Sequence, residues 1–358
     1  MALANETSVQ QRICPACHKR FDFGQGGDVR ACPRCGFMLA SVRMCAGPQS
    51  ERVFLESAHR HANERQRETR RHLSQARCLG LGGGTLLFVN PQDHVLWQID
   101  GYGSVSKATD IMQASASLRH TVLLRQDGTV YGTGDNDDRQ LMLGDITGAT
   151  RVLADKNTTY VVLSTGRVAV RGSCTFKAEV EELEGVRDIS CGAHHVAALM
   201  EDGRVRFACS RSELFALDVF RSDCTWQGVI QLASSDRCTV GLTQEGRVLF
   251  AGDAKDVRSA CTSWANIEAI DVDSGYVVGL TRNGRIRLES SVPSTLDAGR
   301  SEAALWDGVL AVACSQGSIV AIRVGGELLI AGALYGSKNI TAAWRKVAPL
   351  ENGAQPQG

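Results

Sequence analysis

The chain is 358 residues long, and its 39 Lys and Arg residues balance its 39 Asp and Glu residues. That length is enough for two folded units. No apolar run approaches the length needed to cross a bilayer, which argues against a membrane-spanning protein. The charge is unevenly divided, because residues 1–77 hold 13 Lys and Arg against 7 Asp and Glu, while the remainder holds 26 against 32. The resulting net charges of +6 and −6 indicate two parts with different partners.

Cysteine usage and the first residues bear on the cellular compartment. The N-terminus has no basic stretch followed by an apolar one, as a secretory signal would. Four of the 13 cysteines form a spaced motif, and the others are scattered singly. Scattered thiols in a chain of this size are typical of a reducing compartment rather than of a disulfide framework. We therefore expect a cytoplasmic protein.

The spaced cysteine motif lies near the N-terminus. It reads Cys14-Pro-Ala-Cys17, then fourteen residues, then Cys32-Pro-Arg-Cys35. Each Cys-x-x-Cys turn can hold one side of a tetrahedral ion, and the intervening segment is long enough for a hairpin that brings the two turns together. The pattern resembles the zinc-ribbon family. Residues 10–42 are therefore predicted to form a zinc ribbon around one structural Zn²⁺ held by these four cysteines.

The sequence leaves alternatives for this motif. Thiolates also bind iron, so a rubredoxin-like iron site competes with zinc. His18, which follows Cys17, is an alternative ligand. With either metal, so short a segment has too little apolar core to fold alone. Zinc ribbons bind nucleic acid, bind proteins or only fold, so this resemblance does not fix a function.

Residues 48–76 are predicted to form a basic helical connector. No Gly or Pro occurs between residues 49 and 77, and Glu51 lies where the first helical turn would begin. Arginine binds phosphate well, so the helix is a candidate nucleic-acid contact. The favoured interpretation is a solvated spacer with internal Glu–Arg pairs, because no aromatic residue is interleaved for base stacking. The basic part contains Arg60, Arg65, Arg67, Arg70, Arg71 and Arg77, opposed by Glu64 and Glu68.

Hairpin turns recur at regular intervals in the rest of the chain. In each, a β-rich run leads to a two-residue turn ending in glycine, and a second β-rich run follows. Successive turn glycines are 37 to 43 residues apart. The turns are Asp127-Gly128, Thr165-Gly166, Asp202-Gly203, Glu245-Gly246, Asn283-Gly284 and Gly325-Gly326. A seventh, degenerate copy comes first, with its turn at Gln92-Asp93.

Two further positions mark the register of the copies. One lies eight residues before the end of the turn, and is occupied by Thr85, His120, His195, Cys238, Tyr276 and Ser318. In the third copy we expect a hairpin two residues shorter, with Tyr160 in this place. The other marker is a Trp followed three residues later by Val or Ile, at Trp226, Trp264, Trp306 and Trp344. The last of these begins an incomplete eighth copy, 344–350, which is expected to pair with the first blade as a latch.

Repeats of about forty residues built from short strands are typical of propeller blades. We therefore predict a mainly β fold, in which residues 77–350 form a seven-bladed β-propeller of four-stranded blades. It would follow the zinc ribbon and the connecting α-helix, and a disordered tail would occupy 351–358. Closing the ring would remove exposed sheet edges. Helical arrays are excluded, because the runs lack a 3.6-residue period.

The second copy is specific enough to indicate a family. It reads HTVLL at 120–124, DGTVYGTGDN at 127–136 and QL at 140–141, and it resembles the repeat of the regulator of chromosome condensation family. The first half of the fourth copy, ISCGAHH at 189–195 followed by DGRV, resembles it as well. The resemblance implies a seven-bladed propeller, whose members mostly bind proteins. The founding member is an exchange factor for a small nuclear GTPase that docks on chromatin, but no insertion here resembles its GTPase-facing wedge.

The repeat residues are interpreted as structural. The tryptophans are expected to fill space between blades, and the turn glycines to adopt positive φ. His120 and His195 are expected to hydrogen-bond within or between blades. His194 does not form a ligand pair with His195, because neighbours along a strand point to opposite faces.

No catalytic residues are predicted, and the chain is not expected to be an enzyme. Asp135, Asn136, Asp137 and Asp138 form an oxygen-rich loop that is a candidate for Ca²⁺, but their spacing misses the EF-hand pattern. No serine-hydrolase, phosphate-loop or zinc-protease motif occurs. No small-molecule substrate is therefore expected.

Two functions of different classes follow. The favoured one is a protein-binding scaffold, in which a protein partner binds the propeller loops and the zinc ribbon is a second docking module. The alternative is a nucleic-acid- or chromatin-associated factor that contacts phosphates through residues 1–77; a small-GTPase exchange factor ranks below it. No membrane partner is predicted. The copies diverge most after each hairpin, for example at 211–224 and 290–304, and the partner surface is expected there.

Overall fold

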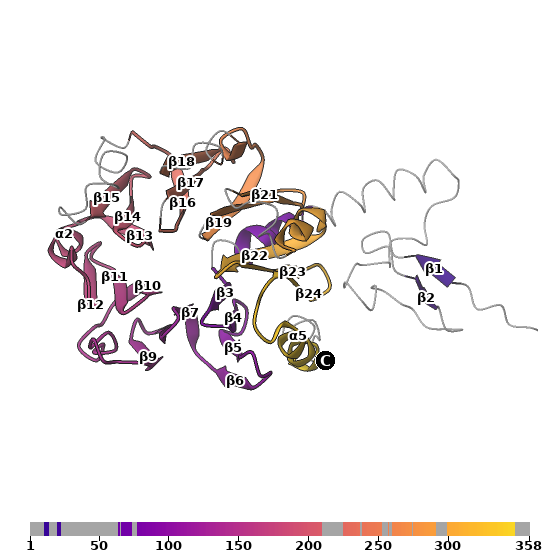
Figure 1. Cartoon of the computed structure of the whole chain (residues 1–358), viewed down its shortest axis with the longest axis horizontal. Coiled ribbons are helices and arrows are strands. Elements are labelled where there is room, and N and C mark those ends of the chain that lie inside the picture. Colours follow the sequence, from indigo (N-terminus) through magenta and orange to yellow (C-terminus); the bar gives the residue numbers. More distant parts are fainter. Residues whose placement is uncertain are drawn as a thin grey trace, which may run out of the picture. The chain divides into compact units, whose positions relative to one another are not determined.

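Figure 1 presents the protein as a computed structural model. It describes residues 11–13, 20–22, 64, 66–73, 77–209, 225–236, 238–252, 257, 260–273, 275–290 and 299–347. The chain divides into two compact units, one made of Met1–Thr69 with Ala354–Gly358 and the other of Arg70–Gly353. None of the described helices is long and apolar enough to cross a membrane.

The smaller unit contains one short hairpin in its described part. Strand β1 (Gln11–Ile13) pairs antiparallel with β2 (Arg20–Asp22), so that Ile13 faces Arg20 across the ladder. Residues 66–73, at the end of the predicted connector, are helical. The tail at 351–358 and the cysteines of the predicted zinc ribbon lie outside the described residues, so those expectations stay predictions.

The larger unit is built from seven small antiparallel sheets, which confirms the predicted mainly β architecture. The first sheet has four strands, β3 (Leu79–Gly82), β4 (Thr85–Asn90), β5 (Val95–Ile99) and β6 (Val105–Ala108). The other six have three strands each: β7 (Ile111–Ala116), β8 (His120–Arg125) and β9 (Val130–Gly134); β10 (Ala149–Asp155), β11 (Thr158–Leu163) and β12 (Val168–Gly172); β13 (Val186–Cys191), β14 (His195–Met200) and β15 (Val205–Cys209); β16 (Val229–Ser234), β17 (Cys238–Thr243) and β18 (Val248–Gly252); β19 (Ile267–Asp273), β20 (Tyr276–Thr281) and β21 (Ile286–Ser290); β22 (Val309–Ser315), β23 (Ser318–Arg323) and β24 (Leu328–Gly332).

The sheets are arranged as the blades of a closed ring. The first strand of each blade contacts the first strand of the next, and β22 of the seventh blade contacts β3 of the first. In Figure 1 these first strands surround the centre, and the last strands lie at the periphery. The loops between first and second strands define one face, which we call the loop face. The Asp-Gly-type turns between second and third strands define the opposite one, the turn face.

Within the residues that the structure describes, six blades have three strands rather than the four that the repeat length predicts. Where a fourth strand was expected, described residues after the third strand are helical in several blades, in α2 (Lys177–Glu181), the 3-10 helix η3 (Arg300–Leu305) and α5 (Ser337–Val347), and at Val257, Ala260 and Cys261 of the fifth blade. In α5 the buried residues are Ile340, Ala343 and Trp344, a spacing of three and four that suits a helix and not a strand.

Helix α5 also corrects the expected form of ring closure. Trp344 lies on this helix and not on an eighth strand, and its ring meets that of Phe88 in the first blade edge to face, with centroids 5.4 Å apart. Its indole Nε1 donates a hydrogen bond to the Gly326 carbonyl oxygen at 2.7 Å. The C-terminal segment therefore packs on the first blade as a helix instead of pairing with it.

The third blade corrects a second expectation. Strand β11 begins at Thr158, eight residues before Gly166, and not at Tyr160. Thr158 pairs with Gly172 as His195 pairs with Cys209 in the fourth blade. The hairpin therefore has full length, and the anticipated two-residue shortening was wrong because Thr158 and Thr159 belong to the strand.

Apolar clusters fill the junctions between blades. Each of the seven junctions has its own cluster, including the one between the seventh and first blades. The four marker tryptophans lie in the last four of these junctions, which confirms that they fill space between blades. Trp264 lies so close to Gly279 that a Cβ there would be 2.8 Å from its ring. The turn glycines, such as Gly203 at φ 79°, have the expected positive φ.

Candidate functional site

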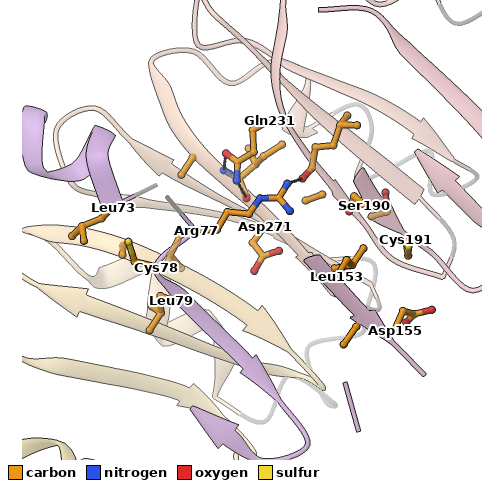
Figure 2. A pocket seen from close by; sticks show the side chains of 18 residues that line it. Leu73, Arg77, Cys78, Leu79, Leu153, Asp155, Ser190, Cys191, Gln231 and Asp271 are labelled. Carbon is orange, nitrogen blue, oxygen red and sulfur yellow. Dashed lines mark hydrogen bonds between the residues drawn. The ribbon is translucent and has the colours of Figure 1, made fainter. Parts of the chain in front are cut away.

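The first strands enclose a cavity near the axis of the propeller. Its volume is about 220 Å³, and its walls come from β3, β10, β13, β16, β19 and β22, together with residues just before the first blade. Figure 2 shows the polar side chains that face it. The ones used below are Arg77, Asp155, Ser190, Gln231 and Asp271.

Arg77 spans this cavity. It precedes the first blade, yet its Nη2 donates a hydrogen bond to the carbonyl oxygen of Leu232 in the fifth blade at 3.1 Å. The same nitrogen lies 2.8 Å from Oδ2 of Asp188 in the fourth blade, with side chains 23 % and 12 % exposed. In Figure 2 the side chain extends from the side of Cys78 toward that of Ser190. The fourth and fifth blades lie across the ring from the first.

The first strands are aligned so that their side chains bond the next blade. Near the start of β7, β13 and β16 a register irregularity precedes the third residue of the strand, which redirects its side chain. In β16 this residue is Gln231, whose amide accepts from Ile270 N at 3.1 Å and donates to Ile270 O at 2.9 Å. In β7 it is Gln113, which accepts from Val152 N at 3.1 Å. These bonds tie adjacent blades along the cavity wall.

The carboxylates of the sixth blade have a similar role. Asp271 accepts hydrogen bonds from the backbone N–H groups of Cys314 at 2.7 Å and Val272 at 2.9 Å. Burial raises the pKa of Asp271 to about 6, and these two hydrogen bonds oppose the shift. Asp273 accepts from the N–H of Gly317. Burial also raises the pKa of Asp155 on the opposite wall, although the Lys156 charge opposes that rise.

The thiols at the cavity are poor nucleophiles. Burial raises the pKa of Cys78 to about 12, and burial together with the Asp155 charge raises that of Cys191 well above its usual value. Both groups are therefore protonated thiols at neutral pH. Among the described residues no histidine lines the cavity.

The repeat histidines tie blades together, as the sequence predicted. The Nε2 atom of His120 lies 2.9 Å from Oγ1 of Thr159 in the next blade, and that of His195 lies 2.7 Å from Oγ1 of Thr239. Burial lowers the pKa of His195 to about 4. His194 is exposed while His195 is fully buried, so the two do not face one site.

The candidate calcium loop is folded as a turn. Asp135 accepts from the N–H of Asp137 at 2.8 Å and pairs with Arg119 at 3.0 Å. Asn136 accepts from the N–H of Leu141 at 2.8 Å. Among the residues that the structure describes, no three His, Cys, Asp or Glu side chains are grouped as a metal site requires. The proposed zinc ligands Cys14, Cys17, Cys32 and Cys35 lie outside those residues.

Two arginines of the predicted basic connector belong to the propeller. Arg70 is 3 % exposed; its Nη2 donates to Arg282 O at 2.7 Å, and its Nε lies 3.4 Å from Glu268. Arg77 is the second. Sequence reasoning treated both as exposed. A signal was present, because Asp188 stands at the repeat position where the second and fifth blades have glutamine, and a carboxylate cannot donate the bond that Gln231 donates.

Comparison with known proteins supports the fold. Residues 113–140 match the Regulator of chromosome condensation (RCC1) repeat, the segment in which the sequence already resembles that family. The Regulator of chromosome condensation of Mus musculus is 37 % identical over 97 residues, which are 27 % of this chain and 17 % of that protein. Its Homo sapiens counterpart is 35 % identical over 102 residues, 28 % of this chain and 18 % of that protein. The matches thus cover less than a fifth of these relatives.

Solved structures of similar shape are propellers. The CRINKLY WD40 ectodomain of the Arabidopsis thaliana receptor kinase ACR4 has a TM-score of 0.54 and 13 % identity, over 72 % of this chain and 95 % of that one. Yeast RCC1 (Prp20), solved with Kap60 bound, gives a TM-score of 0.48 and 12 % identity, over 76 % of this chain and 83 % of that one. At such identities the ectodomain supports the fold alone.

Proposed function

We propose that this chain is a non-enzymatic protein-binding scaffold whose partner docks on the loop face of the propeller. The observation that carries the proposal is that the polar repeat residues are already bonded within the ring. His120, His195, Gln231 and Asp271 all bond adjacent strands or blades and serve the ring itself. A scaffold needs only such a ring with variable loops.

The described residues near the axis differ between the two faces. On the turn face, the segment that contains Arg70 and Arg77 lies against the blades near the cavity. On the loop face, Leu118 is 70 % exposed in the loop between β7 and β8. Loops on the same face carry charged groups, including Arg119 and the Lys156–Asp236 pair, whose side chains are more than half exposed. A single exposed leucine is ordinary on a protein surface, so Leu118 serves here as the probe of this face, whose mixture of apolar and charged groups is of the kind that protein interfaces use.

The relatives favour the same class of function. The matched protein is named for the regulation of chromosome condensation, and its repeat is the one present at residues 113–140. We extend to this chain only the class of function, which is the binding of macromolecules by a propeller. The thiols of Cys78, Cys174, Cys191 and Cys314 are free, which suits the cytoplasmic location that we propose.

The N-terminal part is proposed as a second docking module. Cys14, Cys17, Cys32 and Cys35 would hold one structural Zn²⁺, and the β1–β2 pairing on either side of residues 14–19 is compatible with a knuckle there. The net charge of +6 on residues 1–77 keeps nucleic acid as a second candidate partner. Binding through phosphates would weaken steeply with salt, whereas a zinc-folded protein-binding module would not.

The proposal is tested by affinity capture with the full chain, in nuclease-treated lysate, using Leu118→Asp beside Leu305→Asp. Leu305 is 82 % exposed but lies on η3, outside the loop face. We expect a protein partner that the wild type and Leu305→Asp retain and Leu118→Asp loses, with unchanged stability. Equal capture by both variants would contradict the loop-face assignment. A partner that is captured from untreated lysate but lost after nuclease treatment would favour the nucleic-acid alternative.

A further inference from the structure

The segment from Arg70 to Arg77 is bonded to blades far from the one it precedes. Arg70 bonds the sixth blade through Arg282 O and Glu268. Leu73, which is 3 % exposed, packs in the cluster between the seventh and first blades. Arg77 reaches the fourth and fifth blades through Asp188 and Leu232. These three residues thus contact the first, fourth, fifth, sixth and seventh blades from the turn face.

The fourth blade differs from the blades that bond their neighbours through glutamine. In the fifth blade, the amide of Gln231 both accepts from Ile270 N and donates to Ile270 O. The equivalent residue of the fourth blade is Asp188, which follows the same irregularity in its strand, and the equivalent of Ile270 is Leu232. A carboxylate can accept hydrogen bonds but cannot donate one to a carbonyl oxygen.

Arg77 supplies the donor that Asp188 lacks. Its Nη2 donates to Leu232 O at 3.1 Å, the counterpart of the bond from Gln231 to Ile270 O. Its Nη1 approaches Ile189 O at 3.5 Å, and Asp188 neutralises the guanidinium at 2.8 Å. The backbone of Arg77 has a φ of 48°, in the left-handed region that a residue with a side chain rarely adopts. Such a conformation persists where the surrounding contacts hold it.

We propose that Arg70, Leu73 and Arg77 together act as a strut of the propeller. Arg77 supplies, from across the axis, the bond to Leu232 O that Asp188 cannot donate, beside the bonds from His195 to Thr239 and from Arg187 to Val229 O that already join the fourth and fifth blades. The propeller therefore depends on a segment that precedes its first blade. Loss of the Arg77 contacts loosens this junction, which lies opposite the closure of the ring, before it affects the others.

The strut is tested in the full chain by Arg77→Ala, alone and combined with Asp188→Gln. The readout is amide hydrogen exchange resolved to peptides, with β13 and β16 at the junction and β22 and β23 as the internal reference. Loss of one partner of a largely buried ion pair is expected to speed exchange in β13 and β16 by roughly tenfold to a hundredfold, with little change in β22 and β23. The combined variant is expected to restore slow exchange, because a glutamine in place of Asp188 can bond Leu232 as Gln231 bonds Ile270.

The control is Arg119→Ala, which removes an arginine from an ion pair of similar length, 3.0 Å, on the loop face. It should leave exchange in β13 and β16 unchanged. Unchanged exchange in Arg77→Ala, or an equal rise in all seven blades, would overturn the local strut. Failure of Asp188→Gln to restore protection would overturn the bridge assignment. If Arg77→Ala does not fold, the combined variant alone decides, since the proposal requires that it folds.

Discussion

Two neighbouring junctions of the ring are stabilised by different contacts. One lies between the fifth and sixth blades, and the other between the fourth and fifth blades. The former is mainly apolar in its described part, with Trp264 8 % exposed beside buried Val257 and Cys261. The latter has a smaller described cluster, in which Trp226 and Phe207 are only partly buried. Polar bonds from His195 to Thr239 and from Arg77 to Asp188 and Leu232 supplement this smaller cluster, whereas the former junction has the bonds between Gln231 and Ile270.

The difference shows how a closed ring accommodates unequal blades. Apolar burial contributes roughly in proportion to area and needs no exact geometry. Polar bridges contribute less each, but an unsatisfied buried partner is costly, so they fix the register of adjoining strands. A junction with less apolar filling can therefore be maintained by polar contacts, including one from a segment outside the repeats.

The largest expected effect is the loss of the apolar filling at the junction of the fifth and sixth blades. Trp264→Ala should reduce the free energy of unfolding by about 3–5 kcal/mol, because truncating a buried tryptophan leaves a cavity in addition to the lost burial. Trp226→Ala, at the other junction, should cost less, because this side chain is already partly exposed. Urea denaturation of both variants checks the order. A greater loss for Trp226→Ala would reverse the comparison.

A smaller effect is expected from converting one junction into the other. Gln231→Asp gives the fifth blade the residue of the fourth blade without an arginine to accompany it. Ile270 O loses its donor, and the new carboxylate adds a negative charge near Asp271. We expect a loss of about 2 kcal/mol in the free energy of unfolding. The matched control is Gln126→Asp in an exposed turn, which should be nearly neutral.

The result for Gln231→Asp also bears on the strut. If this variant is as stable as the wild type, a junction does not need a donor to the carbonyl of the next blade. The role assigned to Arg77 at Leu232 would then lose its basis.

The periodic features of the fold could be predicted from the sequence. The turn glycines and the residues eight positions before them located the hairpins, because a two-residue turn and alternating side chains impose a local pattern. The prediction of a fourth strand at the outer edge of each blade was wrong for most blades in the described part of the chain. In α2 the only buried residue is Val180, too little for a periodic pattern. In α5 the buried residues Ile340, Ala343 and Trp344 have a helical spacing, but Trp344 was interpreted as the repeat marker of another strand. Thr158 was missed because Tyr160 looked like the better strand start.

The cavity was not predictable in the same way. His120 and His195 were assigned correctly because they recur in the repeat. Arg77 has no repeat position, and its partners Asp188 and Leu232 are 111 and 155 residues away in the chain. Its charge suggested a solvated helix, since local composition cannot show that the ring brings the fourth and fifth blades opposite the first. Only the mismatch between Asp188 and Gln231 hinted at a distant cation.

The smallest expected effect is a pH dependence that belongs to one junction. His195 is fully buried against Thr239, and its pKa of about 4 lies below the value of about 6.5 for an unfolded histidine. Between these values the unfolded chain binds more protons than the folded one, so stability is complete above pH 6.5 and falls as the pH drops. From pH 7 to pH 5.5 we expect a loss of about 1 kcal/mol from this group.

The measurement compares urea denaturation of the wild type and His195→Gln at both pH values, because glutamine does not titrate yet can bond Thr239. Asp271 has its pKa raised to about 6, so its contribution falls as the pH rises toward 6, in the opposite sense. That contribution is common to both proteins and cancels in their difference. We expect the wild type to lose more stability than His195→Gln between the two pH values. That difference belongs to the junction of the fourth and fifth blades, since the junction of the fifth and sixth blades has Cys238 in place of the histidine. An identical slope in the two proteins would mean that His195 is protonated as easily in the folded ring as outside it.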